Sequence, residues 1–195
     1  MPFQYVNRRG ETYYLLQGKT KTGKPKYYAS KKAEGVAVDQ VPEGYEIYEN
    51  PERGLVSIRK VRPSRVLPDE RAMLVRWTGE LAGIEFFSVD VQEDNLVIYT
   101  PETDPAAAVS LLSRIFGSFP DGEGAEKDRI AQGARYAPML RFTLVDEGKR
   151  LYSAERWCFR GSIDGWHFLC GGQPLERLAA KYLPHLNQES FFELM

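Results

Sequence analysis

The sequence predicts an α+β protein, in which a small N-terminal antiparallel β-meander is followed by an α+β domain with a five-stranded antiparallel sheet and helices on one face. Three observations lead to this prediction. Tyrosine-rich segments alternate with glycine-containing turns over residues 1–66, without a helical period. Apolar residues then recur at helical spacing in three later segments. Short polar turns join the other apolar segments, and strands joined in this way pair antiparallel.

Five segments near the N-terminus have the aromatic and β-branched composition of strands. They are residues 5–8, 12–17, 24–30, 45–48 and 56–61. Two prolines within residues 62–68 indicate a linker. We therefore expect a basic β-rich domain over residues 1–66 and an acidic α+β domain over residues 67–195.

Three helices are expected in the second domain. The first begins at Pro68, the second is capped by Asp104 and ends at Gly117, and the third begins near Pro174. Their apolar faces are Met73, Trp77 and Leu81 in the first, Val109, Leu112 and Phe116 in the second, and Leu175, Leu178, Ala179 and Tyr182 in the third. Such faces need a partner surface, which the sheet supplies.

The strands of this domain follow from alternation and from the turns between them. They are residues 84–91, 96–100, 139–146, 151–160 and 166–170. Residues 118–136 are polar and are expected to form a loop with room for a short helix near residues 127–134. The tail, residues 190–194, is apolar enough to dock on the body of the domain.

Composition and charge exclude several classes of protein. The 195 residues are 43% hydrophobic and 27% charged, which argues against long disorder. Apolar runs are short, and the first ten residues have no apolar signal-peptide core, so we expect a cytoplasmic protein with no membrane partner. Residues 1–66 hold 13 Lys and Arg against 7 Asp and Glu, whereas residues 67–195 hold 13 against 20. The net charges of the two parts are opposite in sign, which favours two units that bind different partners or that attract each other.

Residues 18–24 fit the pattern Gly-x-x-x-x-Gly-Lys of a phosphate-binding P-loop. The pattern fails at the next position, where Pro25 replaces the Ser or Thr that would hold magnesium. The following Lys-Tyr-Tyr favours a strand, not the helix that a P-loop needs. A hairpin connection with glycine at both ends explains the segment better.

The same segment suggests a basic surface. Cationic side chains on a β-ribbon contact phosphates, and tyrosine rings stack on bases. The candidate nucleic-acid-binding residues are Arg8, Arg9, Lys19, Lys21, Lys24, Lys26, Tyr13 and Tyr28. The arrangement Arg-Gly-x-Thr-Tyr-Tyr, followed by a Gly-Lys turn and another strand, is similar to small three-stranded DNA-binding sheets. The alternative is that the lysines only keep an edge strand from pairing with other chains.

Cys158 and His167 are the candidate catalytic pair. If residues 161–164 form a four-residue loop, Cys158 lies opposite His167, and an imidazole beside a thiol can activate it. In this register, four aromatic residues form the core face of the hairpin, and Arg156 and Arg160 share the other face with the pair. The alternative is an ordinary small cysteine next to an ordinary histidine. Neither a disulfide with Cys170 nor a zinc site fits the spacing, so we expect two free thiols, no metal and no cofactor.

Three functions remain open on these grounds. The first is a non-enzymatic binding protein whose basic hairpin contacts nucleic acid or an acidic protein surface. The second is a small enzyme or ligand-binder that uses the face around Cys158 and His167. The third is a protein–protein adaptor that binds through its aromatic tail. A pocket around Cys158 and His167 would favour the second, and a continuous basic surface with exposed tyrosines would favour the first.

Overall fold

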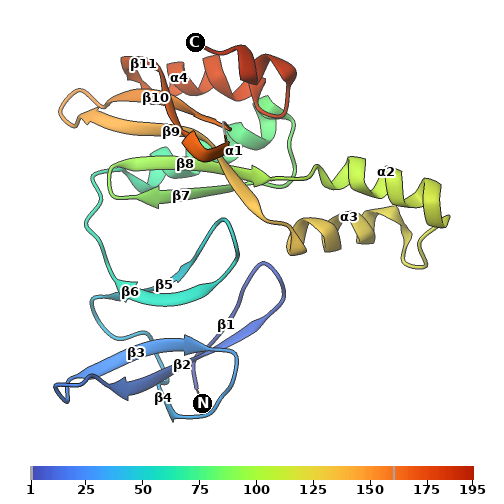
Figure 1. Ribbon diagram of the computed structural model, residues 1–195. Coiled ribbons are helices and arrows are strands. Elements are labelled where there is room, and N and C mark those ends of the chain that lie inside the picture. The colour runs from blue at the N-terminus through green and yellow to red at the C-terminus, as the bar shows by residue number, and fades with distance from the viewer. Residues whose placement is uncertain (1, 160) are drawn as a thin grey trace. The chain divides into compact units, whose positions relative to one another are not determined.

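The computed structural model describes residues 2–159 and 161–195, and its described part is α+β, with four α-helices and two antiparallel sheets besides a separate hairpin (Figure 1). The chain divides into two compact units. One consists of Met1–Arg62 with Thr103–Arg135, and the other of Pro63–Glu102 with Tyr136–Met195. The first division lies close to the linker expected at residues 62–68. Each of the two units, however, is made of two separate stretches of chain.

The first unit begins with a small antiparallel sheet. Its strands are β1 (Gln4–Val6), β2 (Thr12–Lys19), β3 (Pro25–Ser30) and β4 (Val36–Ala37). Strand β2 lies between β1 and β3, and β4 pairs with the second half of β2. A separate hairpin follows, made of β5 (Tyr45–Glu49) and β6 (Val56–Lys60). Each of the five strands predicted in this region is present in the structure. Strand β4 was not predicted, because a strand of two residues is too short to show an alternation of apolar and polar residues.

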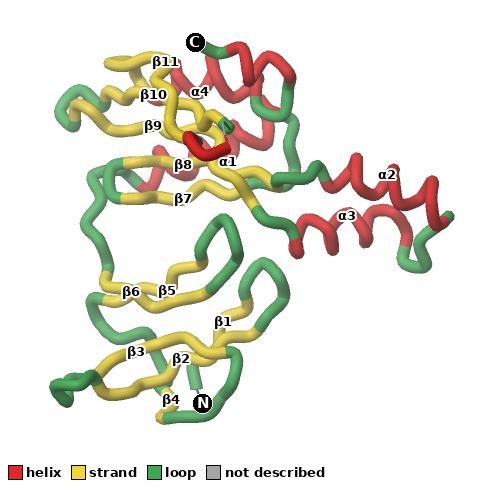
Figure 2. Tube along the Cα trace, in the orientation of Figure 1, coloured by secondary structure: helices red, strands yellow, loops and turns green. Residues whose placement is uncertain are grey.

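Two helices in the same unit form an antiparallel helical hairpin, α2 (Pro105–Phe116) and α3 (Gly122–Gly133) (Figure 2). Asp104 caps α2 as predicted, since its side chain accepts a hydrogen bond of 3.0 Å from the Ala106 backbone N–H. The apolar face is only partly as predicted, because Val109 is buried whereas Phe116 is exposed. Helix α3 begins five residues before the short helix that the sequence suggests.

The second unit contains the predicted five-stranded antiparallel sheet. Its strands are β7 (Ser88–Gln92), β8 (Asn95–Pro101), β9 (Tyr136–Asp146), β10 (Leu151–Cys158) and β11 (Gly165–Pro174). They lie in the order β11-β10-β9-β8-β7, so every strand pairs with its neighbours in the chain. Helices α1 (Pro68–Ala82) and α4 (Leu175–Tyr182) and the tail bury their apolar side chains in one core with this sheet.

The buried face of α4 is the predicted one, but that of α1 is not. Leu74 and Thr78 are the buried residues of α1, Met73 and Trp77 are partly buried, and Leu81 is exposed. The Thr78 hydroxyl donates a hydrogen bond of 2.7 Å to the Leu74 carbonyl, so a polar residue is buried with its hydrogen bond satisfied. The predicted apolar face of α1, which ran through Met73, Trp77 and Leu81, is therefore wrong: the buried residues are each one position further along the chain.

The register predicted for the β10–β11 hairpin is also wrong. Trp157 pairs with Trp166, and Cys158 closes the ladder opposite Gly165. The connection between the strands therefore spans residues 159–164, two residues more than the predicted loop, and contains a 3₁₀ turn at Gly161–Ile163. Because the register shifts by two residues, His167 lies opposite Arg156 and not opposite Cys158.

Candidate functional site

Residues 20–24 form the tight connection between β2 and β3 and not a phosphate loop. The Thr20 N–H donates to the Lys24 carbonyl at 2.8 Å, and the Gly23 N–H donates to the Thr20 carbonyl at 2.9 Å. The Thr20 hydroxyl also accepts from the Lys24 N–H at 3.0 Å. Gly23 has a φ of +80°, which favours glycine. The hairpin explanation is confirmed, since Pro25 starts a strand where a P-loop would start a helix.

Four lysines crowd the end of this hairpin. Lys19, Lys21, Lys24 and Lys26 are all exposed, and none makes an ion pair with any residue that the structure describes. No Asp or Glu occurs anywhere in residues 12–33. The local charge is therefore uncompensated within the strands that carry it, which creates a positive surface at this end of the sheet.

The two candidate tyrosines differ in accessibility. Tyr28 is 38% exposed and lies two residues after Lys26, so both side chains leave the same face of β3. Its ring lies over Gly18 of β2, where an added Cβ would be 3.4 Å from the ring. Tyr13 is 6% exposed and Lys31 lies above its ring, so it belongs to the core of the sheet and presents no free stacking surface.

Arg8 and Arg9 have structural partners within their own unit. The Arg8 guanidinium donates to the Glu52 carbonyl at 3.0 Å and to the Ala134 carbonyl at 3.3 Å. The Arg9 guanidinium donates to the Gly133 carbonyl at 2.7 Å. Both arginines thus join the β1–β2 turn to the C-terminal end of α3, and we leave them out of the contact surface proposed below.

Glu49 is likewise engaged and does not neutralise the lysines. It accepts a hydrogen bond of 2.9 Å from the Tyr5 hydroxyl and one of 3.1 Å from the Arg8 N–H. Burial, together with the hydrogen bond to this carboxylate and its charge, raises the pKa of Tyr5 to about 12. The phenol therefore stays protonated and continues to donate its hydrogen bond at neutral pH.

The structure does not bring Cys158 and His167 together as a cross-strand pair. Cys158 is 8% exposed and shares the face of β10 that Tyr152 and Ala154 bury in the core. Phe159 and Phe168, two of the four aromatic residues predicted to form the core face of the hairpin, are exposed instead. The faces of this hairpin are therefore the reverse of those predicted.

The remaining residues of that predicted face are accounted for separately. Arg156 holds the tail, as its guanidinium donates to the Leu194 carbonyl at 2.7 Å and to the Phe192 carbonyl at 3.2 Å. Arg160 lies outside the described residues. Cys158 and Cys170 are free thiols, and no cluster of three or more metal-ligating side chains occurs among the described residues.

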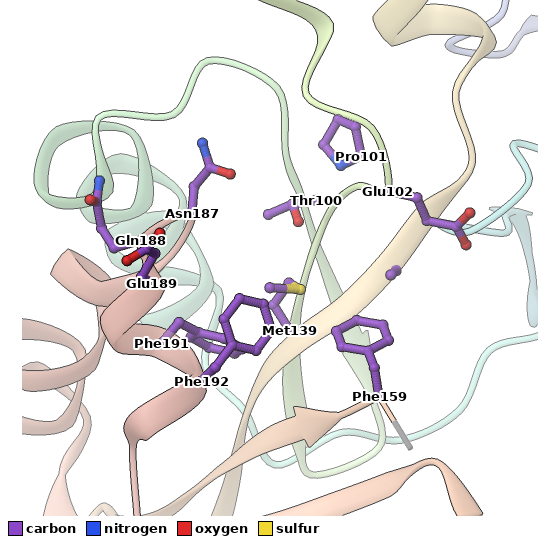
Figure 3. Close-up of a pocket in the computed structure, with 11 residues that line it drawn as sticks. Thr100, Pro101, Glu102, Met139, Phe159, Asn187, Gln188, Glu189, Phe191 and Phe192 are labelled. Carbon is purple, nitrogen blue, oxygen red and sulfur yellow. The ribbon is translucent and has the colours of Figure 1, made fainter. Parts of the chain in front are cut away.

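A pocket of about 550 Å³ lies elsewhere in the second unit (Figure 3). It is formed by the end of β8, the start of β9, the residue after β10, and the tail. Its lining residues are Thr100, Pro101, Glu102, Ala137, Met139, Phe159, Asn187, Gln188, Glu189, Phe191 and Phe192. Neither Cys158 nor His167 is among these lining residues, so this pocket does not support an enzyme at that pair.

The sequence analysis missed this pocket, although the amino-acid sequence holds one signal for it at Pro138. Pro138 lacks an N–H group and cannot donate to a sheet ladder, so a proline at this place indicates a bulge or an edge. The structure has a register shift there, with Ile98 opposite Leu140 and Tyr99 opposite Pro138. Met139 is the extra residue of this bulge, and it lies in the floor of the pocket.

No helix in the described part of the chain is long and apolar enough to cross a membrane. Comparisons of the sequence with family models and with curated proteins, and of the structure with solved structures, find no match.

Proposed function

We propose that the protein binds nucleic acid through the β2–β3 hairpin, with Lys19, Lys21, Lys24 and Lys26 contacting phosphates. The observation that carries this proposal is the set of four exposed lysines without an ion-pair partner in the described part of the chain. A lysine that is already free gives up no internal ion pair when it binds a phosphate. Its binding also releases counterions from the nucleic acid, which drives association at low salt.

Tyr28 favours nucleic acid over an acidic protein surface as the partner. Its half-exposed ring lies on the same strand face as Lys26. A base can stack on such a ring while the neighbouring phosphate meets the lysine, and stacking contributes about 1–3 kcal/mol per base. The carboxylates of an acidic peptide supply negative charge, but they bring no ring to each charged group as the bases of a nucleic acid do. The proposed mode is therefore sequence-tolerant binding, because phosphates and ring faces carry little base information.

The competing explanation is that the lysines protect an edge. Strand β3 lies at the edge of its sheet, and lysines on edge strands discourage pairing with other chains. The two explanations differ in one measurable respect. Edge protection needs no ligand, whereas phosphate contact gives an affinity that falls with salt.

The test measures binding of the full chain to labelled single-stranded and double-stranded oligonucleotides by fluorescence anisotropy across a salt series. Four phosphate contacts predict a slope of log affinity against log salt of about −3 on single strands and about −4 on duplexes. Replacing the four lysines by glutamine should abolish this binding. A control that also removes four positive charges, at Arg71, Arg76, Lys149 and Arg177 of the second unit, should retain most of it.

Tyr28 is tested separately on the single strand. Tyr28→Ala should weaken binding about 5- to 150-fold, whereas Tyr28→Phe keeps the ring and should bind almost normally. Absence of binding at ~50 mM salt, or equal losses in the two four-residue variants, would overturn the proposal. Binding of polyglutamate but not of oligonucleotides would identify an acidic protein partner instead.

A further inference from the structure

We propose that the pocket between the end of β8 and the tail binds a small organic cation with an aromatic or aliphatic body. This site belongs to the second unit and is independent of the nucleic-acid proposal. A volume of about 550 Å³ lies within the ~300–1,000 Å³ that small-molecule sites occupy. The ligand class follows from the apolar lining, from the charges at the rim, and from the contacts that hold the wall in place.

The floor of the pocket and part of its wall are apolar, while Thr100, Asn187 and Gln188 add neutral polar groups to the lining. Ala137 and Met139 of β9 are buried, and Phe191 is completely buried beside them. Phe192 is 59% exposed, and its ring meets that of Phe191 edge to face, with 5.5 Å between the ring centroids. Figure 3 shows Phe192 and Phe159 on opposite sides of Met139. The apolar part of a ligand bound between these rings would be removed from water and would contact the aromatic faces.

The charged side chains that line the pocket are all acidic. Glu102 follows β8 and Glu189 begins the last turn of the tail, and both are exposed. Neither makes an ion pair with the described residues, and no Lys, Arg or His is among the described lining residues. Aromatic faces also carry negative potential and attract cations. Among the described lining residues, an anionic ligand would therefore meet two carboxylates, whereas a cation would meet carboxylates and aromatic rings.

The wall formed by the tail is held by contacts that do not involve a ligand. Arg156 binds the carbonyls of Phe192 and Leu194, and the Phe191 N–H donates to the Gln188 carbonyl at 3.0 Å. His185 Nδ1 and Ser190 Oγ, 2.9 Å apart, share a further hydrogen bond across the same turn. The pocket is thus formed in advance, which lowers the ordering cost of binding a ligand.

Three probes of similar size and different charge test the proposal on the full chain. They are 2-phenylethylamine, a cation at neutral pH, the neutral 2-phenylethanol, and the anion phenylacetate. Met139 is one of four methionines, so a methyl-labelled sample gives few signals and reports on the floor of the pocket. We expect the amine to shift the Met139 methyl signal with an affinity about tenfold above that of the alcohol, and phenylacetate to bind weakest, because two nearby carboxylates act through solvent.

Variants separate the role of charge from that of shape. Replacing Glu102 and Glu189 together by glutamine should remove the preference for the amine and leave binding of the alcohol unchanged. Phe192→Ala should weaken the binding of both the amine and the alcohol. The matched controls are Glu193→Gln and Phe168→Ala, which change exposed residues that do not line the pocket. The proposal is overturned if no probe shifts Met139 at about 10 mM, or if the alcohol binds as tightly as the amine.

Discussion

Replacing Glu70 by glutamine tests the hydrogen-bond network that ties the start of α1 to β10. The Glu70 carboxylate accepts from the Leu67 N–H at 2.8 Å, from the Tyr152 hydroxyl at 2.7 Å, and from Arg150 Nε at 2.9 Å. Arg150 Nη2 makes a second hydrogen bond to the same carboxylate. The amide oxygen of glutamine can take the place of Oε2 and still accept from Leu67, Tyr152 and Arg150 Nη2, but its NH₂ group then takes the place of Oε1 and faces the Arg150 Nε donor.

The expected loss of stability comes from the two bonds to Arg150: the Nε bond is lost, and the Nη2 bond is then made to a neutral oxygen instead of a carboxylate. A hydrogen bond to a charged group contributes about 1.5–3 kcal/mol when sheltered, whereas an exposed ion pair contributes about 0–1 kcal/mol. The Glu70 side chain is 13% exposed and that of Arg150 is 29% exposed, so the pair is intermediate. We expect Glu70→Gln to lower the free energy of unfolding by about 2 kcal/mol at pH 7.

The effect should depend on pH in a defined direction. Burial opposes ionisation of Glu70, but the hydrogen bonds from Arg150, Tyr152 and Leu67 outweigh it and hold its pKa below the ordinary value. The ionised group therefore stabilises the fold at pH values above about 4.3, the unfolded value, and this stabilisation is lost as pH falls through the lower folded pKa. The difference between wild type and Glu70→Gln should shrink accordingly below about pH 4.

Urea unfolding followed by tryptophan fluorescence measures this difference. All three tryptophans, Trp77, Trp157 and Trp166, lie in the unit that contains Glu70. Glu80→Gln on the exposed side of α1 is the control and should change stability by less than about 0.5 kcal/mol. A loss below about 0.5 kcal/mol for Glu70→Gln, or a loss that is equal at pH 7 and pH 3, would refute this account of the network.

Two further predictions concern the cap of α2 and the buried thiol. Asp104→Ala should destabilise α2 by about 1 kcal/mol and speed amide hydrogen exchange in residues 105–116. Asp121→Ala should have a smaller effect on α3, because Asp121 makes no capping hydrogen bond, and equal effects would contradict the cap assignment. Cys170 should react with alkylating reagents before Cys158, which is buried opposite Gly165. Fast alkylation of Cys158 near pH 6 that His167→Ala abolishes would show an activated thiol instead.

The contrast between α4 and α1 shows where helical periodicity is sufficient. In α4 the apolar residues are separated cleanly from charged ones, so only one face can be buried. In α1, Met73, Leu74 and Val75 are consecutive, and several phases of the helix would bury part of them. The face that is buried contains Thr78, whose hydroxyl hydrogen-bonds to a carbonyl of the same helix. A hydrophobic pattern counts threonine as polar and therefore does not predict that this face is buried.

The β10–β11 hairpin shows why register is harder to predict than the presence of strands. Gly161 lies between the two strands and Gly165 begins β11, and either glycine can accommodate the end of a loop. A two-residue difference in loop length leaves alternation intact but changes every cross-strand pair. The choice of faces failed for another reason: aromatic residues were assigned to the core, although α1, α4 and the tail cover the opposite face of the sheet.

The basic hairpin and the pocket differ in how far apart their residues lie in the chain. The hairpin lies within one short segment, so charge and turn residues are sufficient to identify it. The pocket combines four segments, and its floor depends on a bulge. Regular alternation would send Met139 and Leu140 to opposite faces of β9, yet both are buried. The extra residue at the bulge permits this, and Pro138 beside it lacks the N–H that a continuous ladder would need. Strand β9 therefore contributes side chains to both the core and the pocket at a bulge that contains a proline. The position of this bulge depends on the pairing of β9 with β8, so it is seen only in the folded sheet.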